Sequence, residues 1–311
     1  MRLAIMGSGG VGGYFGARLA EAGHDVTFIA RGEHLAEMQR HGLRVESIEG
    51  DLHLAQVKVS DDPSRVGAVD AVLVAVKSWQ VAEAARAIRP MIGPDTFVVP
   101  LENGVEAADT LAGILGQAHV LDGLCGILAW REAPGHIRHA GVSPFVRFGE
   151  RDNRRSKRAL RLKAAFDQAR GVTAEIPDDI QVAVWSKFLF ICAMSGIGSV
   201  TRAPIGVTRT LPETRTMIEQ LLAEIEAVAR ARGVALPEDA AARALRFIDA
   251  LPEASTASMQ RDIMAGLPSE LDAQNGAVMR LGREAGVATP VNAMVYAALL
   301  PQERAARHIT G

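Results

Sequence analysis

A run of glycines near the N-terminus has the spacing that phosphate binding requires. It follows an apolar stretch, Arg2–Met6, typical of a short strand, and precedes a helical pattern over residues 14–22. In this setting the first glycine permits a tight turn, the second lets the backbone approach a pyrophosphate, and the third lets helix and strand pack closely. The helix N-terminus then offers free N–H groups to phosphates. Dinucleotide binding is predicted, rather than a glycine-rich turn without a ligand, for Gly7, Ser8, Gly9, Gly10, Val11 and Gly12.

The end of the second expected strand, Asp25–Ala30, indicates which dinucleotide binds. Folds that bind NAD usually place Asp or Glu here, where a carboxylate accepts hydrogen bonds from the ribose 2′-OH. This chain has Ala30 and Arg31 instead. A guanidinium binds a 2′-phosphate bidentately, whereas a carboxylate repels it. We therefore predict NADP(H) over NAD(H); the opposite preference would depend on the nearby Glu33 and on a solvated Arg31.

Two further candidates, Lys77 and Asn103, follow apolar runs at 69–76 and 96–101 that are typical of buried parallel strands. Ligands of open α/β sheets lie beyond the carboxyl ends of the strands, which is also where the glycine run lies. A lysine in a solvated loop would by itself be unremarkable. The inference of a ligand contact therefore depends on where Lys77 and Asn103 lie, at the same edge of the sheet as the glycine run. We expect both side chains to contact cofactor or substrate, and we expect Ser78 to cap the helix after Lys77.

A lysine and a carboxylate in the second half of the chain could do acid–base chemistry. Lys187 lies in the apolar run WSKFLF, where solubility does not explain a cation. An ammonium in a partly buried cleft can protonate a developing alkoxide; the alternative is a lysine that reaches from a buried helix to water. Glu270 could act in the site or only favour a helix dipole. Ser269 and Asp272 beside it have the spacing of a capping box.

The elements that must position these residues divide the chain in two. Strand and helix patterns alternate over 1–177, which predicts a Rossmann-type doubly wound α/β sheet, with an additional strand pair at 43–48 and 52–59. Residues 178–311 predict an all-helical C-terminal domain that supplies substrate and catalytic groups in a cleft between the domains. Helices are expected at 180–197, 210–232, 238–250, 258–266, 269–286 and 291–307.

Composition excludes several classes of protein. The 311 residues are 48% hydrophobic and 23% charged, as in soluble globular domains, and the net charge of −2 argues against nucleic acid or an anionic membrane as partner. Cys125 and Cys192 lack C-x-x-C spacing, and His136 and His139 would point to opposite faces of a strand, so no disulfide framework and no metal site is expected. No leader is visible, and the uncharged stretch 188–201 is too short for a bilayer. A cytoplasmic protein is predicted.

Over essentially its whole length the chain resembles the ketopantoate reductase (2-dehydropantoate 2-reductase) family. The likeness is carried by these motifs: MGSGGVGGYFG with Arg31, VAVKSWQ, LENG, GHIRHAG, WSKF, SMQRDI, SELDAQNG and ATPVN. The resemblance implies an NADP-dependent oxidoreductase that reduces a 2-oxo acid to a 2-hydroxy acid. Ketopantoate is the leading substrate and pantothenate biosynthesis the implied pathway.

The resemblance also implies roles for individual residues. Lys187 would be the catalytic acid, and Glu270 its carboxylate partner, in contact with the cofactor as well. Asn103 would lie between nicotinamide and substrate, and Ser258 would bind the substrate carboxylate. Arg31 and Lys77 would contact the phosphates or ribose of NADP(H).

Three positions depart from the pattern of the family's pantoate-forming members. Ile191, Ser195 and Ile205 stand where those members carry asparagines. A desolvated hydroxyl without a partner costs about 1–3 kcal/mol, so the reaction class carries over better than the substrate. The alternatives are a reductase of another 2-oxo acid or ketone, a hydroxy-acid dehydrogenase, and a non-catalytic NADPH-binding protein. The oligomeric state, a homodimer included, is left open by the sequence.

Overall fold

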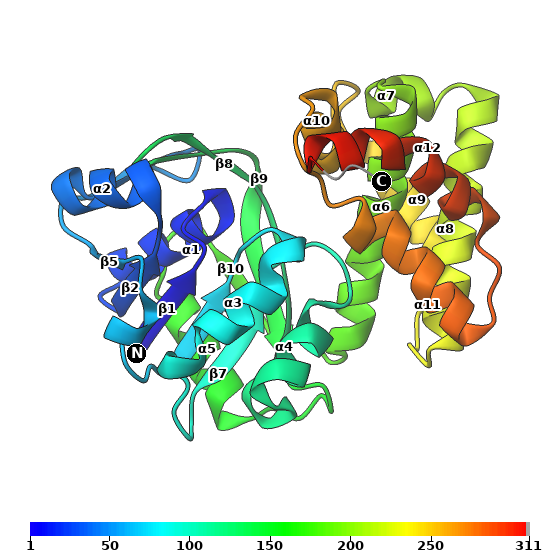
Figure 1. The fold of residues 1–311 in the computed structure, drawn as a ribbon. Helices are drawn as coiled ribbons and strands as arrows, with labels where there is room; N and C mark the ends of the chain where they lie inside the picture. The colour runs from blue at the N-terminus through cyan, green and yellow to red at the C-terminus, as the bar shows by residue number, and fades with distance from the viewer. Residues whose placement is uncertain (309–311) are drawn as a thin grey trace. The chain divides into compact units, whose positions relative to one another are not determined.

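The computed structural model describes residues 1–308 and divides into two compact units (Figure 1). The first comprises Met1–Glu102 and Ala107–Ile180; the second comprises Asn103–Glu106 and the described residues from Gln181 onward. An α/β unit followed by a helical unit confirms the predicted fold class. The predicted domain boundary after residue 177 stays a prediction.

A five-stranded parallel sheet forms the centre of the first unit, in the order β5-β2-β1-β6-β7. Leu3 of the central strand is in register with Val26 on one side and Ala71 on the other. The strand order therefore reverses between β1 and β6, and ligands of such sheets bind beyond the carboxyl ends of the strands at that point. The strands are β1 (Arg2–Met6), β2 (Asp25–Ile29), β5 (Lys58–Ser60), β6 (Ala71–Val74) and β7 (Phe97–Pro100).

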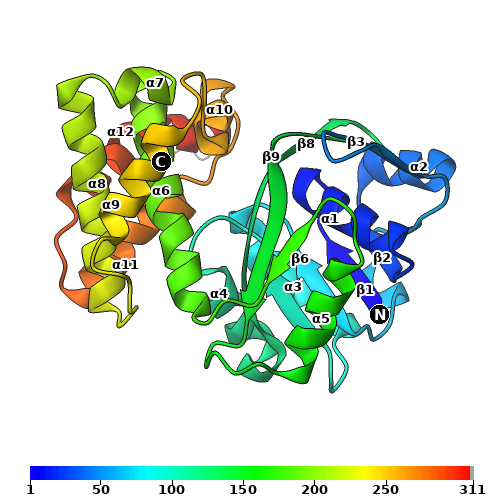
Figure 2. The same ribbon diagram turned by 180° about the vertical axis from the view of Figure 1, so that it is seen from behind.

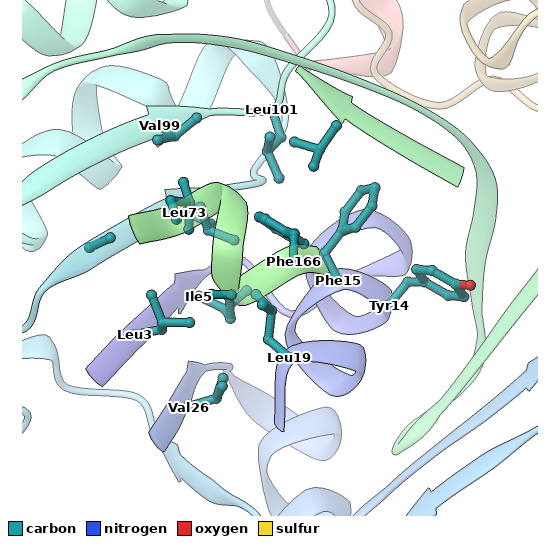
Figure 3. Packing of buried hydrophobic residues seen from close by; sticks show 14 of the residues in the cluster. Leu3, Ile5, Tyr14, Phe15, Leu19, Val26, Leu73, Val99, Leu101 and Phe166 are labelled. Atoms are coloured by element: carbon teal, nitrogen blue, oxygen red, sulfur yellow. The ribbon is translucent and has the colours of Figure 1, made fainter. Parts of the chain in front are cut away.

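Helices cover both faces of this sheet because both faces of its strands are apolar. Leu3 and Ile5 point to the face where Phe166 packs (Figure 3), and Ala4 and Met6 belong to a second core on the opposite face, with residues of α3 and α4. The helices of the unit are α1 (Gly10–Glu21), α2 (Gly32–His41), α3 (Val81–Ala87), α4 (Ala107–Leu115) and α5 (Lys157–Asp167).

A second sheet has the order β10-β9-β3-β4, with β8 antiparallel to β9. The strand predicted at 52–59 is wrong: its first part pairs with β3 in this sheet, and its last part is β5, which pairs with β2 in the other sheet. The chain divides at Ala55 and Gln56, whose exposed side chains add nothing to either core. The strands of this sheet are β3 (Leu43–Ser47), β4 (Leu52–Leu54), β8 (Asp122–Ala133), β9 (His136–Gly149) and β10 (Thr173–Glu175).

The second unit is built around one long helix, α6, whose apolar residues share a core with those of the helices around it. Figure 2 shows α8 and α9 side by side within this unit. Pro290 is the first residue of α12, one residue before the expected start at 291. The helices are α6 (Ile180–Thr201), α7 (Ile205–Thr208), α8 (Pro212–Ala231), α9 (Ala240–Ala250), α10 (Ser258–Met264), α11 (Ala277–Ala285) and α12 (Pro290–Ala306).

The helix predicted over 269–286 is wrong in its first part. A π-helical turn, η5 (Asp272–Gly276), precedes α11, and the Gly276 N–H donates to the Leu271 carbonyl at 3.0 Å. The turn places Asn275 against Gly196 of α6. A Cβ built on Gly196 would lie only 3.0 Å from the amide nitrogen of Asn275, which shows how close the two residues are. π-helical turns are frequent at functional sites.

Within residues 1–308, α6 is the one helix long and apolar enough to cross a membrane, and 61% of its most apolar window is buried. Burial of that extent is what the core helix of a soluble protein shows. The uncharged stretch 188–201, on which the prediction from the sequence rests, is too short to cross a bilayer. The helix itself is longer, because it begins at Ile180 and includes Lys187.

Candidate active site

The glycine-rich loop lines a pocket of about 280 Å³ in the first unit. Of the predicted cofactor residues there, Gly7, Ser8, Gly9 and Arg31 line it. The others are not part of the lining and include Gly10, Val11, Gly12 and Lys77. The pocket lies where the chain leaves β1 and β2, at the position that the parallel sheet favours for a ligand.

The glycines of the loop are required for different physical reasons. A Cβ on Gly12 would lie 2.0 Å from the Gly7 carbonyl oxygen, so glycine is needed there for packing. Gly7 has φ +98°, which other residues rarely adopt. A Cβ on Gly9 would meet no atom of the described chain within 4 Å. The missing side chain at Gly9 leaves room for a ligand, and this cradle fits the pyrophosphate of a dinucleotide.

A buried histidine, His34 of α2, contacts the backbone of the glycine-rich loop. Its Nε2 donates to the Ser8 carbonyl at 2.7 Å, and its Nδ1 accepts from the Gly135 N–H at 2.9 Å. Because one ring nitrogen is an acceptor, the ring is neutral. Burial lowers the pKa of His34, and the nearby charge of Arg131 lowers it further. Sequence reasoning missed His34, because nothing local marks the contact with Gly135.

The predicted 2′-phosphate residue, Arg31, precedes α2 and is exposed. Its guanidinium lies 3.3 Å from the carboxylate of Glu83, which also lines the pocket. A second guanidinium, that of Arg131 on β8, lines the same pocket and was missed by sequence reasoning. The two arginines are far apart in sequence, and only the sheet brings them to one cavity.

Lys77 lies beyond β6 and is exposed, with its Nζ 5.8 Å from the centroid of the Trp79 ring. The expected cap at Ser78 is wrong, since Ser78 is already the first residue of a short 3₁₀ helix, η2 (Ser78–Gln80). The side chain of Gln80 instead accepts a hydrogen bond from the Lys77 N–H, at 3.3 Å. The amide three residues on therefore satisfies the donor at the start of the turn.

A buried carboxylate, that of Glu102, joins the segments that follow two strands. It accepts from the Val76 N–H at 3.0 Å and from the Leu101 N–H at 3.1 Å. It thereby ties the backbone beyond β6, which leads to Lys77, to the backbone beyond β7. Sequence reasoning used this part of the chain only for Asn103 and missed Glu102.

Asn103, Lys187 and Glu270 form a hydrogen-bonded chain in the second unit. The Lys187 Nζ donates to Asn103 Oδ1 at 2.9 Å, and Asn103 Nδ2 donates to Glu270 Oε2 at 3.0 Å. Lys187 is half-buried and Glu270 is 6% exposed. Because an ammonium only donates and a carboxylate only accepts, these two partners determine which way the amide points. Three distant parts of the sequence thus meet around one amide.

Ion pairs hold the Asn103 segment against the π-helical turn. Arg280 of α11 donates to Glu106 at 2.7 Å and to the side chain of Asp272 at 2.8 Å. Although burial opposes it, the pKa of Arg280 is raised by these carboxylates. Gly104, at φ +110°, lies against the Ala273 carbonyl oxygen. The loop that carries Asn103 is therefore fixed next to the turn that follows Glu270.

The segment that carries Glu270 is held by a residue of α12 and not by the expected capping box. The Ser269 N–H donates to the buried carboxylate of Glu303 at 3.0 Å, and the Ser269 hydroxyl donates to it as well. The same hydroxyl accepts from the Leu271 N–H at 3.2 Å. Asp272 pairs with Arg280 instead. The capping box is wrong because a carboxylate distant in sequence outcompetes the local partner.

The remaining predicted substrate residues also lie in the second unit. Ser258 is the half-buried first residue of α10. Ile191 is half-buried, and Ser195 and Ile205 are buried. The Ser195 hydroxyl has no hydrogen-bond partner within residues 1–308.

Comparisons with known proteins agree over nearly the whole chain. The family model "Ketopantoate reductase PanE/ApbA" matches residues 3–153, and "Ketopantoate reductase PanE/ApbA C terminal" matches residues 179–303. The chain is 31% identical to the uncharacterized oxidoreductase YkpB of Bacillus subtilis, over 96% of this chain and 98% of that protein. It is 30% identical to a 2-dehydropantoate 2-reductase of Nostoc sp., over 93% and 91% of the two chains.

A solved structure gives the same result in three dimensions. A PanE/ApbA family ketopantoate reductase from Ralstonia eutropha superposes with a TM-score of 0.90, at 34% identity, over 99% of this chain and 100% of that chain. The fold and the relatives define an oxidoreductase that binds NAD(P)H and acts on CH–OH donors. The chain belongs to the ketopantoate reductase family.

Proposed function

We propose that this protein reduces a 2-oxo acid to a 2-hydroxy acid with NADPH, and that its substrate is 2-dehydropantoate (ketopantoate), which gives pantoate for pantothenate biosynthesis in the cytoplasm. The observation that carries the proposal is the hydrogen-bonded chain from Lys187 through Asn103 to Glu270. A positioned ammonium with a carboxylate held nearby is the arrangement that reduction of a ketone needs. The names of the relatives support the substrate.

In the proposed reaction Lys187 supplies the proton. When bound, the reduced nicotinamide supplies the hydride to the carbonyl carbon. Negative charge then develops on the carbonyl oxygen, where the Lys187 ammonium stabilises it and donates a proton. Asn103 holds the ammonium in position by accepting one of its hydrogen bonds. Glu270 orients Asn103 and is the carboxylate partner of the site.

The cofactor preference is proposed from Arg31 and from the absence of an acid at the end of β2. Gly7 to Gly12 would cradle the pyrophosphate, and Arg31 would bind the 2′-phosphate. Lys77, Asn103 and Glu270 are proposed as further cofactor contacts. The cradle at Gly9 supports the pyrophosphate part of this proposal.

On the substrate side, Ser258 is proposed to bind the carboxylate of the oxo acid. The second candidate function is reduction of a less polar 2-oxo acid, and Ile191 and Ile205 favour it, since neither offers a hydrogen bond to the hydroxyl of ketopantoate. Ketopantoate and its analogue with a methyl in place of the hydroxymethyl group separate the two candidates. A kcat/KM for ketopantoate above about 10⁴ M⁻¹s⁻¹, higher than for the analogue, supports the first. The reverse order supports the second.

The role of Lys187 is tested by Lys187→Ala, followed by NADPH oxidation with ketopantoate and by NADPH titration. Loss of the acid should lower kcat by at least about 10²-fold, while NADPH still binds. The exposed Lys157 at the start of α5 offers the matched control Lys157→Ala, which should keep full activity. A fully active Lys187→Ala protein would overturn the assignment.

A further inference from the structure

The pocket of the first unit contains a cation whose function neither the motif nor the family comparison assigns. Arg31 and Arg131 both line this pocket, together with Gly7 to Gly9 of the glycine-rich loop. Arg31 comes from the segment just after β2 and Arg131 from β8 of the second sheet. Two guanidinium groups therefore reach one cavity from different sheets.

The position of Arg131 is fixed by close contacts between β8 and the glycine-rich loop. A Cβ on Gly10 would lie 2.4 Å from the Ala129 carbonyl oxygen and 2.7 Å from the Cα of Trp130. The backbone of β8 therefore crosses the first turn of α1 directly, and Arg131 is the next residue along it. Glycine at position 10 is what permits this approach.

The other end of the hairpin is tied to the same loop by His34. This ring joins Gly135, in the turn between β8 and β9, to the Ser8 carbonyl. His34 is neutral and its two nitrogens are already used, so it cannot serve as the cation for a ligand. Its contacts hold the hairpin that carries Arg131 over the phosphate-binding loop.

The two arginines differ in what else they bind. Arg31 shares its charge with Glu83, and both side chains are about two-thirds exposed. Arg131 is exposed and has no ion pair or hydrogen bond of its side chain in the part of the chain that the structure describes. A phosphate monoester carries a charge of about −1.5 to −2 at neutral pH, more than one partly neutralised guanidinium offsets. The donors of Arg131 remain available for such a group.

We propose that Arg131 is a specificity-determining residue that binds the 2′-phosphate of NADPH together with Arg31, and so sets the preference for NADPH over NADH. The proposal rests on the proposed function, whose cofactor it refines. The 2′-phosphate lies between the end of β2 and the β8–β9 hairpin. NADH has a hydroxyl at that position and gains nothing from the second guanidinium.

Calorimetric titration of the purified protein with NADPH and with NADH tests this without any turnover. Arg131→Ala should raise the Kd for NADPH about tenfold or more and leave the Kd for NADH within about twofold, because a charge-assisted contact to the phosphate is lost. The matched control is Arg138→Ala on the same hairpin, whose guanidinium pairs with Glu46 at 2.6 Å. It should change neither Kd. Arg131→Lys should retain part of the preference, since it keeps the charge but loses the bidentate geometry.

The outcomes separate this inference from the function on which it rests. A wild-type protein that binds NADH as well as NADPH would contradict the proposed cofactor and, with it, the role of Arg131. A wild-type preference for NADPH that survives in Arg131→Ala would overturn the inference alone and leave Arg31 as the phosphate ligand. An equal rise of the Kd for NADPH and for NADH in Arg131→Ala would also overturn the inference. That result would mean that Arg131 maintains the conformation of the hairpin and does not bind the 2′-phosphate.

Discussion

At the scale of single residues, position 103 requires a side chain with properties that few amino acids have. It must accept from the Lys187 ammonium on one side and donate to the Glu270 carboxylate on the other. Aspartate would accept from the ammonium but repel Glu270, and leucine of similar size would remove the hydrogen bonds of this amide to both charges. The neutral amide, with one donor end and one acceptor end, therefore joins a cation and an anion within one site.

Also at this scale, two glycines of the phosphate loop should respond in opposite ways to alanine. Gly9→Ala should fold with wild-type stability, since its Cβ meets nothing within 4 Å in the described chain, but should weaken NADPH binding by at least about tenfold by occupying ligand space. Gly12→Ala should lower the stability of the first unit, because its Cβ would clash with the Gly7 carbonyl. Thermal unfolding and NADPH titration of both variants check this. Unchanged NADPH affinity in Gly9→Ala would contradict the ligand role of that position.

At the scale of elements, buried polar contacts connect the π-helical turn η5 to two helices. Asn275 Nδ2 donates to Asn292 Oδ1 at 3.0 Å, and Asn292 Nδ2 donates to Glu224 of α8 at 2.7 Å. The Glu224 carboxylate also accepts the Val291 and Asn292 N–H groups, at 2.8 and 2.9 Å, in the first turn of α12. One carboxylate thus satisfies the start of α12 and supports the turn that follows Glu270.

Removing this carboxylate with Glu224→Ala should destabilise the protein by about 1.5–3 kcal/mol, since backbone donors and a buried amide lose a charged acceptor. Glu224→Gln keeps an acceptor oxygen and should lose less. Urea unfolding of the wild-type and both variants gives the difference. Equal stability of Glu224→Ala and wild-type protein would mean that water replaces the carboxylate at no cost.

At the scale of the whole molecule, the stability should depend on pH through two histidines, the buried His34 and the half-buried His24. Burial lowers the pKa of His24 and of His34 below the ordinary value of 6.5. The unfolded chain therefore binds protons at a pH where the folded chain does not, so stability is fully present above pH 6.5 and falls as the pH drops below it. The charged groups near His34, namely Arg131 and the Arg31–Glu83 pair of the same pocket, stay in place when only His34 is changed.

His34→Gln should accordingly flatten this dependence. Glutamine can donate and accept but does not titrate, so the loss of stability between pH 7.5 and 5.5 should be smaller than in wild-type protein. Urea midpoints at the two pH values measure it. The exposed His53→Gln serves as control and should follow the wild type. An identical loss in His34→Gln and wild type would show that His34 does not carry the effect.

Features that depend on neighbours along the chain could be predicted from the amino-acid sequence alone. The strand Arg2–Met6, the glycine run after it and the helical second half follow from local apolar patterns and backbone conformation, and the fold class is confirmed. The resemblance also placed Lys187 and Glu270 in one site, although the hydrogen bonds that join them through Asn103 could not be read from the sequence. Their roles stay predictions.

Contacts between groups that are distant in sequence depend on how the folded chain packs. Arg131 reaches the phosphate pocket because β8 crosses α1 at Gly10, and Asn103 joins Lys187 to Glu270 because the loop after β7 packs on the π-helical turn. Two of the expectations that failed, the strand at 52–59 and the continuous helix from 269, were overruled by partners in other parts of the chain. Local patterns report which face of an element is apolar. Hydrogen bonds and close contacts between remote segments are set by how those faces are packed.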